Sequence, residues 1–322
     1  MAVIDSVGTS LNITRQAGLD EIFYQGYEMN KQPGGVYADD PLFFQQGDTP
    51  WGFINGAEYK GPGDYDQVDE DEEVPESTIK IANKFNREVL EFDKDIAIPQ
   101  RYQEDSEMYQ VTNNLVRDMG VRGRTTRDKF AMRNSWGNPF DSTNNPTPDG
   151  AAFGSNSHVL LDGSTFDNLE TSALSPDSVA TGVKKLRLQK AHDGDLASYH
   201  ADGMLGPVVL HPEMTEITKS ELKSQTTDND LNYWSQIYPG LKVGASEYLD
   251  STYNTLNSNA DTSFAICSMM HGVERKQRIP LSTDYIGPEY DRKRRAFYRA
   301  RFRERVILAN SGLGVEWNNG TA

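Results

Sequence analysis

The clearest pattern in this sequence is an alternating segment that runs directly into a long stretch with helical periodicity. Residues 78–98 alternate between apolar and polar positions, as expected for a β-strand. Over residues 106–134, apolar or helix-compatible side chains instead recur every three or four positions, which is the period of an α-helix. The sequence therefore predicts a strand followed by one unusually long helix. We expect Val111, Leu115 and Met119 of this helix to pack against a sheet.

The residues around this helix predict where it begins and what lies beside it. It begins after Pro99, because proline disrupts a helix interior, and Asp105 or Ser106 can accept the first free backbone amides. At about 1.5 Å per residue the helix is about 42 Å long, more than twice the average for globular proteins. Gly120 and Gly123 each cost about 1 kcal/mol relative to alanine. We therefore expect another backbone to pass close to that turn.

Shorter signals complete the predicted order of elements. Residues 19–29 place apolar side chains on one helical side, which predicts a docking helix within an extended N-terminal arm. Residues 175–177 supply an N-cap serine, a first-turn proline and an acid at a helix start, so a helix is expected over about 176–191. A second helix is expected over 211–223, after the strand-like residues 207–210.

Four segments, taken in order, resemble the major capsid proteins of tailed bacteriophages. They are NKFNREVLEFDKDI from Asn83, VTNNLVRDMGVRGRTTRDK from Val111, SNSHVLLDGSTFDNLETSALSPDSVATGVKKLRLQKAHDGD from Ser155 and PVVLHPEMTEITKSELKS from Pro207. More narrowly, they are similar to the phage Mu-type major head subunit, which has the Hong Kong 97-like capsid fold. The resemblance covers about residues 80–310 and depends on the order of the segments, since no single motif is diagnostic.

The resemblance implies an α+β fold with a fixed order of parts. These are an N-terminal arm (1–50), an extended loop (51–92), a peripheral domain with a long spine helix (93–165), an axial domain (166–261) and the C-terminal strands of the peripheral domain (262–322). The arm and the loop are poor in apolar residues relative to the central region. We therefore expect neighbouring subunits to hold both segments in the assembled shell.

The function implied by the resemblance is assembly of the icosahedral head of a tailed bacteriophage around double-stranded DNA. The implied partners are other copies of the chain, as hexamers and pentamers, with portal, scaffold or decoration proteins as further partners. Packaged DNA would be held by weak non-specific contact. The protein would be made in the host cytoplasm and located in the virion capsid. Within the same fold, the alternative is an encapsulin-like protein compartment.

Composition fits a chain that builds a sizeable core. Hydrophobic residues make up 36% of the 322 residues, and the mean hydropathy is -0.66. No stretch approaches the ~20 apolar residues needed to span a bilayer, and no secretion signal is recognised at the N-terminus, so no membrane partner is expected. The single cysteine, Cys267, lies among apolar residues and is expected to be a buried strand thiol.

The distribution of charge is more informative than its total. A net charge of -16 argues against a protein whose main task is to grip nucleic acid through its overall field. Eight carboxylates lie between Asp64 and Glu76 with no base among them, and eight bases lie between Arg292 and Arg305. Like charges within each run repel one another, so a surface of opposite charge would stabilise either run.

The basic run alternates with apolar residues. Arg299, Arg301, Arg303 and Arg305 would share one face of a strand, and Tyr298, Ala300, Phe302 and Val306 would share the other. Three interpretations of the cationic face stay open: a solvated surface, a contact with nucleic acid, or a contact with an acidic loop of another subunit. The resemblance favours the third. The candidate acidic residues are Asp69, Glu70, Asp71, Glu72 and Glu73.

A catalytic alternative, a metal-dependent hydrolase, depends on one cluster of histidines and carboxylates. His192, Asp193, Asp195, His200, Asp202, His211 and Glu213 lie within twenty-two residues, and both side-chain types are common metal ligands. Their spacing matches no ligand template, and Asp193-Gly194 and Asp202-Gly203 are typical turn dipeptides. No nucleophile elbow surrounds Ser157, and no phosphate-binding glycine loop is present. We therefore expect no enzymatic activity, no cofactor and no metal.

Overall fold

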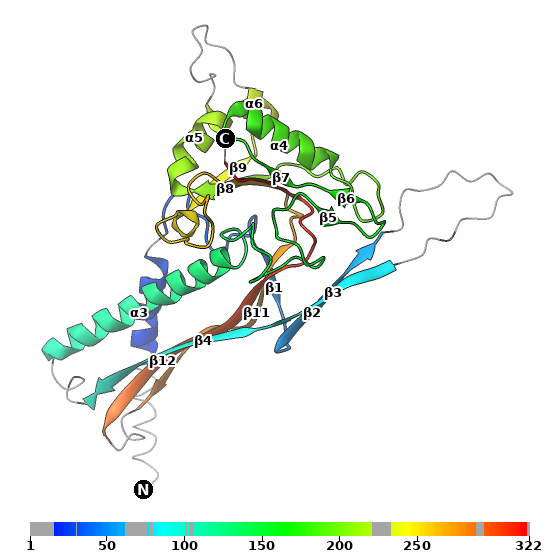
Figure 1. The fold of residues 1–322 in the computed structure, drawn as a ribbon. Coiled ribbons are helices and arrows are strands. Elements are labelled where there is room, and N and C mark those ends of the chain that lie inside the picture. The colour runs from blue at the N-terminus through cyan, green and yellow to red at the C-terminus, as the bar shows by residue number, and fades with distance from the viewer. Residues whose placement is uncertain are drawn as a thin grey trace, which may run out of the picture.

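The computed structural model describes residues 16–29, 31–61, 76, 80–100, 102, 106–220, 233–287 and 293–320, with the backbone alone at 106–109 and 233. The described chain forms two main sheets, a long helix and a separate hairpin (Figure 1). Among the described residues, none of the helices has the length and apolar character needed to cross a membrane.

The first sheet has four strands in the order β1-β11-β12-β4. Its strands are β1 (Gln45–Asp48), β4 (Leu90–Pro99), β11 (Val273–Ile286) and β12 (Arg295–Leu308). Strand β1 is parallel to β11, whereas β12 is antiparallel to both β11 and β4. The long helix α3 (Ser106–Arg133) lies along this sheet (Figure 1).

The second sheet has five strands in the order β7-β13-β10-β8-β9. Its strands are β7 (Leu169–Glu170), β8 (Gly203–Pro207), β9 (Lys242–Ser246), β10 (Phe264–Cys267) and β13 (Val315–Asn318). Helices α4 (Pro176–Leu188), α5 (His211–Lys219) and α6 (Tyr233–Ile237) lie beside it, with the 3-10 turns η1 (Val208–Leu210) and η2 (Glu247–Leu249) after β8 and β9. Apolar side chains of α4, α5 and the sheet form one buried cluster.

The hairpin of β2 (Phe53–Lys60) and β3 (Lys80–Glu88) forms a separate two-stranded sheet, and its loop-side end lies beside the loops near β5 and β6 (Figure 1). The alternating segment that was predicted as one strand is therefore two strands, β3 and β4, which belong to different sheets. The change occurs at Val89, which is buried with Ile54 and Ile307. A small pair, β5 (His158–Val159) and β6 (Thr165–Phe166), completes the strands.

Helix α3 confirms the predicted long helix, but its buried side differs from the predicted one. Val111 and Leu115 are 45% and 47% exposed, so the prediction that they pack against the sheet is wrong, whereas Met119 is buried. The buried stripe includes polar residues, namely Thr112, Arg124 and Asp128, together with Val116, Met119, Ala131 and Met132. Because the N-terminal segment supplies hydrogen bonds to Arg124 and Asp128, these polar side chains tolerate burial and the apolar pattern alone misplaced the stripe.

The expected close backbone approach on α3 is present at Gly120. A Cβ atom at Gly120 would lie 2.1 Å from the carbonyl oxygen of Phe23, in the N-terminal helix of residues 16–28. The approach is mutual, because a Cβ at Gly26 would lie 2.2 Å from the carbonyl oxygen of Arg117. Gly123 differs, since its Cβ would meet Phe23 at an ordinary 3.7 Å. Two glycines thus allow the helices to cross in contact.

The N-terminal segment is more deeply embedded than an extended arm. Phe23, Phe43 and Phe44 are fully buried, and Val36 and Ala38 belong to the same core as Trp136. The expectation that other subunits hold this arm is therefore wrong for residues 16–29 and 31–50, which pack on their own subunit. Residues 1–15 lie outside the described part of the chain.

The remaining predictions had mixed outcomes. Helix α4 begins as predicted, with Ser175 and Ser178 forming a reciprocal capping box, and α5 begins at His211. Residues 208–210, predicted as strand, form a 3-10 turn instead. Cys267 is fully buried in β10, as expected. The domain boundaries stay a prediction, but strands of residues 262–322 divide between the two sheets, with β10 and β13 in the second.

The helix crossing predicts different effects on stability for two nearby glycine-to-alanine substitutions. Gly120→Ala should lower the thermal unfolding temperature, because its Cβ would collide with the backbone of Phe23. Gly123→Ala is the matched control. It should leave that temperature unchanged or raise it, since alanine is about 1 kcal/mol more favourable than glycine in a helix interior. Circular dichroism melts of the two variants would measure this. Equal stability of both variants would contradict the crossing geometry.

Candidate subunit interface

The arginine ladder of β12 lies on one face of the first sheet, as the alternation predicted. Tyr298, Ala300 and Phe302 are buried on the face toward α3. Arg301 is exposed on the opposite face, while Arg299, Arg303 and Arg305 are partly buried there. The predicted cationic face is therefore confirmed. Carboxylates of the neighbouring strands determine how many of its arginines form ion pairs within the subunit.

Strand β4 supplies carboxylates to two of the four arginines. Its register places Asp93 opposite Arg301 and Glu91 opposite Arg303. The Arg299 guanidinium lies 3.5 Å from a carboxylate oxygen of Asp93, and Arg303 donates to Glu91. The hydrogen bond from Arg303 holds the pKa of Glu91 below its usual value. Part of the ladder is thus neutralised within the subunit.

Arg301 and Arg305 form no ion pair with any of the described residues. Burial lowers the pKa of Arg305, and the nearby Arg87 charge acts in the same direction while Glu88 opposes both. The Nε atom of Arg305 is buried with no hydrogen-bond partner in the described structure. The predicted partner residues, Asp69 to Glu73, lie outside the described residues, so their pairing with the ladder stays a prediction.

Glu304 interrupts the apolar face of β12 and is fully buried. Its Oε2 atom accepts from Nε of Arg275 at 2.9 Å and from Nε of Arg127 at 3.0 Å. Arg275 belongs to β11 and Arg127 to α3, and both donate to the amide oxygen of Gln277. Two guanidinium groups therefore share one carboxylate at the centre of the first sheet.

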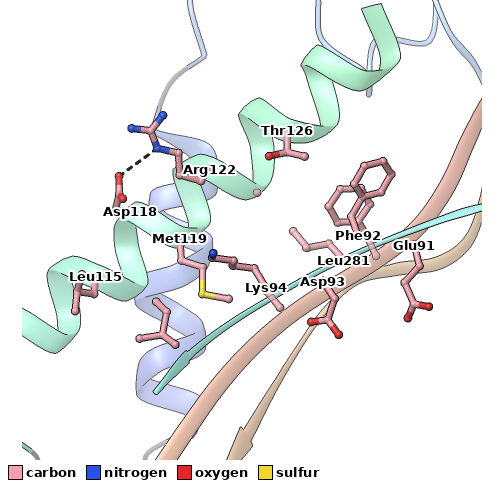
Figure 2. Close-up of a pocket in the computed structure, with 14 residues that line it drawn as sticks. Glu91, Phe92, Asp93, Lys94, Leu115, Asp118, Met119, Arg122, Thr126 and Leu281 are labelled. Carbon is pink, nitrogen blue, oxygen red and sulfur yellow. Dashed lines mark ion pairs between the residues drawn. The ribbon is translucent and has the colours of Figure 1, made fainter. Parts of the chain in front are cut away.

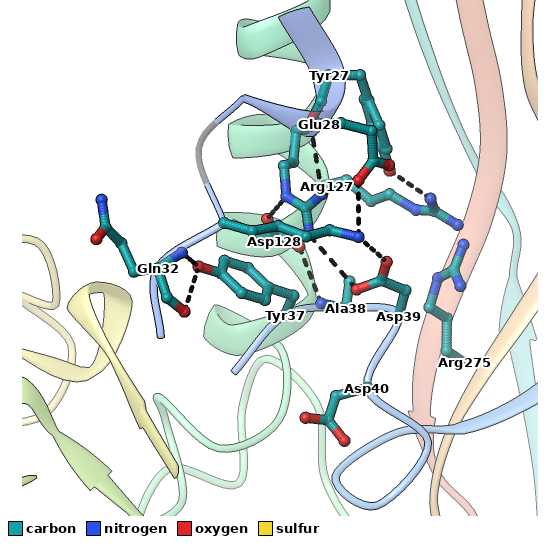
Figure 3. A network of polar contacts seen from close by, with 12 residues as sticks. Tyr27, Glu28, Gln32, Tyr37, Ala38, Asp39, Asp40, Arg127, Asp128 and Arg275 are labelled. Carbon is teal, nitrogen blue, oxygen red and sulfur yellow. Dashed lines mark hydrogen bonds and ion pairs between the residues drawn. The ribbon is translucent and has the colours of Figure 1, made fainter. Parts of the chain in front are cut away.

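The same network continues into the N-terminal segment. Arg127 donates to the Tyr27 hydroxyl at 2.6 Å, and the Ala38 amide donates to Asp128 at 2.9 Å (Figure 3). The Arg124 guanidinium lies 4.4 Å from the centre of the Tyr37 ring and 3.3 Å from Asp128. Burial raises the pKa of Asp128 to about 6 despite these partners. These bonds fasten the N-terminal segment to α3.

Sequence reasoning missed Glu304, although a signal was present. Glu304 stands at the alternating position between Phe302 and Val306, where the predicted strand requires an apolar side chain. Because burying an unpaired charge is costly, a carboxylate at a core position predicts a buried cation beside it. Arg127 and Arg275, which supply it, have no local pattern that distinguishes them from exposed arginines.

One buried carboxylate, that of Glu58 near the loop-side end of the β2–β3 pair, fastens the hairpin to the rest of the subunit. It accepts from the Asn83 amide at 2.6 Å, from the Ser311 hydroxyl at 2.8 Å and from the Ser311 backbone amide. Nε2 of His192 lies 3.3 Å from the same carboxylate. Burial disfavours the charged form of Glu58, but these hydrogen bonds outweigh it and lower the pKa. The loop-side end of the strand pair is thus anchored by its own subunit.

The outer face of the hairpin, in contrast, exposes large apolar side chains. Tyr59 and Ile81 stand opposite each other across the strand pair and are 65% and 60% exposed. Phe53 and Trp51 are exposed at its start. Two-stranded hairpins are marginally stable alone, and apolar side chains gathered on one exposed face are typical of interaction sites.

A groove of about 530 Å³ lies between α3 and the first sheet. Figure 2 shows Met119, Lys94 and Leu281 within it, while Glu91 and Asp93 point away from α3. These two carboxylates pair with Arg303 and Arg299. Leu115 lines its outer end. The exposure of Leu115 thus reflects an open space beside the sheet.

The structure does not assemble the proposed hydrolase site. Within the described ranges no group of three or more histidine, cysteine, aspartate or glutamate side chains could hold a metal ion. His192 contacts Glu58 of the hairpin instead. Asp193-Gly194 forms the predicted turn, with Gly194 at a φ of 94°. The turn predicted at Asp202-Gly203 is wrong, because Gly203 is the first residue of β8 and is packed against Phe43.

A scan against protein-family models found no match, and neither did a search of curated proteins.

Solved structures match over nearly the whole chain. The capsid of Ralstonia phage GP4 is 8% identical with a TM-score of 0.57, and the match covers 90% of this chain and 92% of that chain. The capsid of a native GTA particle is 15% identical with a TM-score of 0.52, covering 92% and 97%. The SrpI encapsulin of Synechococcus elongatus PCC 7942 is 10% identical with a TM-score of 0.50, covering 90% and 91%.

These likenesses define the fold. The chain has the Hong Kong 97-like capsid fold, an α+β architecture, as the resemblance predicted. At such low identity the likeness is one of fold alone. The narrower similarity to the Mu-type subunit stays a prediction.

The shared carboxylate predicts a large difference between two glutamate substitutions. Glu304→Gln should lower the free energy of unfolding by about 3 to 5 kcal/mol, because it leaves two buried guanidinium groups without their common charge. Glu91→Gln is the control and should change it little, since the side chains of Arg303 and Glu91 lie at the surface, 31% and 38% exposed, where an ion pair contributes about 1 kcal/mol or less. Urea unfolding of unassembled subunits would measure both. Similar losses in the two variants would contradict the assigned role of Glu304.

Proposed function

We propose that this chain is a capsid subunit that assembles into the icosahedral head of a tailed bacteriophage and encloses double-stranded DNA. The observation that carries the proposal is the hairpin of β2 and β3, which Glu58 anchors near its loop-side end and which is apolar on its outer face. A subunit with two well-packed sheets gains nothing by itself from such an exposed face. A second copy that covers Tyr59 and Ile81 would remove apolar surface from water.

The likeness in fold to the phage GP4 and GTA capsids supports a shell of many copies. We infer that the copies associate as hexamers and pentamers, in which many modest contacts add up. Portal, scaffold or decoration proteins are proposed as further partners. The proposed location is the virion capsid, after synthesis in the host cytoplasm.

The charge pattern supports weak rather than tight contact with DNA. The net charge is -16, and Arg299 and Arg303 already pair with carboxylates of β4. A surface neutralised in this way releases few counterions on binding DNA. The second candidate function is an encapsulin-like compartment, which the likeness in fold to the SrpI encapsulin supports. The metal-dependent hydrolase gains no support from the described residues.

The proposed function predicts closed particles that contain nucleic acid. Chain expressed in the presence of its phage genome should form shells visible by negative-stain electron microscopy, and DNA inside them should survive added DNase. Shells filled with a protein cargo and free of DNA would favour the compartment. Chain that stays monomeric at every concentration and salt condition would overturn both shell functions.

We further propose that the unpaired part of the ladder contacts an acidic surface of a neighbouring subunit, with Asp69 to Glu73 as the first candidate. The support is that Arg301 and Arg305, unlike Arg299 and Arg303, have no ion-pair partner among the described residues. Single exposed pairs contribute less than about 1 kcal/mol. Repetition on every subunit of a shell makes the sum significant.

Charge reversal tests this pairing. Arg301→Glu should impair shell assembly, and a lysine introduced in place of Glu72 should restore part of it. Lys129→Glu, an exposed reversal on α3, is the matched control and should assemble normally. Added salt should weaken assembly, since exposed charges are screened over about 8 Å at physiological ionic strength. Normal assembly of Arg301→Glu, measured by light scattering and microscopy, would exclude the pairing.

A further inference from the structure

The second sheet carries an apolar groove at one end and an apolar ridge at the other. Strands β8 and β9 are parallel, so both begin at the same end of the sheet. Residues 196–200 lead into β8 and α6 leads into β9, and these segments line the groove. The turns η1 and η2 follow the two strands and form the ridge at the opposite end.

The groove has an apolar floor with basic side chains at its border. Its volume is about 540 Å³. Leu188, Leu196 and Ile237 line it, and each is more than half exposed. Lys184 and Arg187 of α4 also line it and are exposed. A partner for this groove should therefore present small apolar side chains flanked by carboxylates.

The ridge has that chemistry. Val208 and Val209 of η1 are exposed, with Val209 at 62%. Glu213 in the first turn of α5 and Glu247 at the start of η2 are exposed beside them. Helix α5 contacts η1, and β9, which leads into η2, contacts η1 as well. The valines and the two carboxylates thus lie on one end of the sheet.

The charges at both ends lack ion-pair partners within the described part of the subunit. Neither Lys184 nor Arg187 pairs with a described carboxylate, whereas Lys185 between them pairs with Asp167 and Glu170. Glu213 and Glu247 likewise form no ion pair with a described base. All four side chains are exposed, so each can meet a charge of opposite sign on another molecule.

We propose that the groove of one subunit binds the ridge of a second copy, with Val208 and Val209 covering Leu188, Leu196 and Ile237. Glu213 and Glu247 then lie against Lys184 and Arg187. This inference rests on the proposed shell function and names the surfaces that join neighbours within one ring. Because groove and ridge are different surfaces at opposite ends of the sheet, the contact is heterologous, and in the proposed shell the rotation between copies closes it into a ring of five or six.

The geometry distinguishes this contact from a two-fold dimer. An isologous contact joins a patch to the same patch, which would set Lys184 and Arg187 against another Lys184 and Arg187. Like charges across an interface are unfavourable. Pairing groove with ridge instead matches apolar with apolar and base with acid. The occupant of the groove is therefore the ridge of another copy.

Disulfide trapping tests the contact directly. A chain with both Leu188→Cys and Val209→Cys should, when assembled and oxidised with oxidised glutathione, give a ladder of covalent oligomers that ends at rings of five and six. Each bond joins two thiols, and glutathione takes up the two electrons. The native Cys267 cannot interfere, because it is fully buried and burial raises the pKa of its thiol. Chains with either cysteine alone are the controls and should stay monomeric on denaturing gels.

Charge reversal gives an independent readout. The double variant Lys184→Glu, Arg187→Glu should lose at least about tenfold in assembled fraction, since like charges would then face each other. Adding Glu213→Lys and Glu247→Lys should restore assembly, because the complementarity is regained with its sign exchanged. Lys129→Glu is again the matched control. Thermal melts of unassembled chains should be unchanged in all variants, because these side chains are exposed.

The outcomes separate this inference from the proposed function. If wild-type chain forms shells but the double cysteine chain gives no ladder, or the reversed chain assembles normally, the contact is wrong while the shell function stands. If Leu188→Cys crosslinks instead to Glu72→Cys of the acidic run, or to Leu222→Cys of the same chain, the groove has another occupant and the proposal fails. If wild-type chain forms no shells at all, the proposed function fails and the ring contact with it.

Discussion

The carboxylate of Glu304 is the interaction on which the arrangement of the first sheet depends. It binds Arg275 of the neighbouring strand β11 and Arg127 of α3. Arg127 in turn binds Tyr27 of the N-terminal helix, and Arg275 binds Gln46 of β1. Five segments that are distant in sequence therefore meet at one charge. Removing one partner of a buried charge is strongly destabilising, so the network favours the observed position of the helix on the sheet.

The contrast between paired and unpaired charges divides the molecule into an interior and an assembly surface. The buried carboxylates of Glu58 and Glu304 bind partners of the same subunit. Arg301 on β12 and Lys184 on α4, which pair with none of the described carboxylates, are exposed, and each adjoins a surface that we propose as a contact with a second copy. Apolar side chains follow the same division, since the hairpin exposes Tyr59 and Ile81 although the sheets bury theirs. In the proposed shell, contacts with other copies would cover the apolar side chains that remain exposed in the single subunit.

The sequence predicted the positions of helices and strands better than it predicted which of their faces are buried. The length of α3, the two faces of β12 and the cap of α4 followed from periods and end signals that act over a few residues. The buried stripe of α3 did not follow, because Arg124 and Asp128 are polar and are buried only through bonds to residues near position 38. The change of sheet at Val89 was invisible for a similar reason, since alternation continues through it.

What the sequence determined by itself was local: which residues are helical, which strand positions share a face, and where glycines permit a close approach at Gly120. Backbone preferences and side-chain periodicity depend on residues close in sequence, so they can be recognised before the fold is known. The tertiary structure determined which faces are buried and which charges form ion pairs within the subunit. Glu58 and its partner Ser311 are separated by 253 positions in the chain. Neither residue has a local signal for the other, because only the packing of both sheets brings them together.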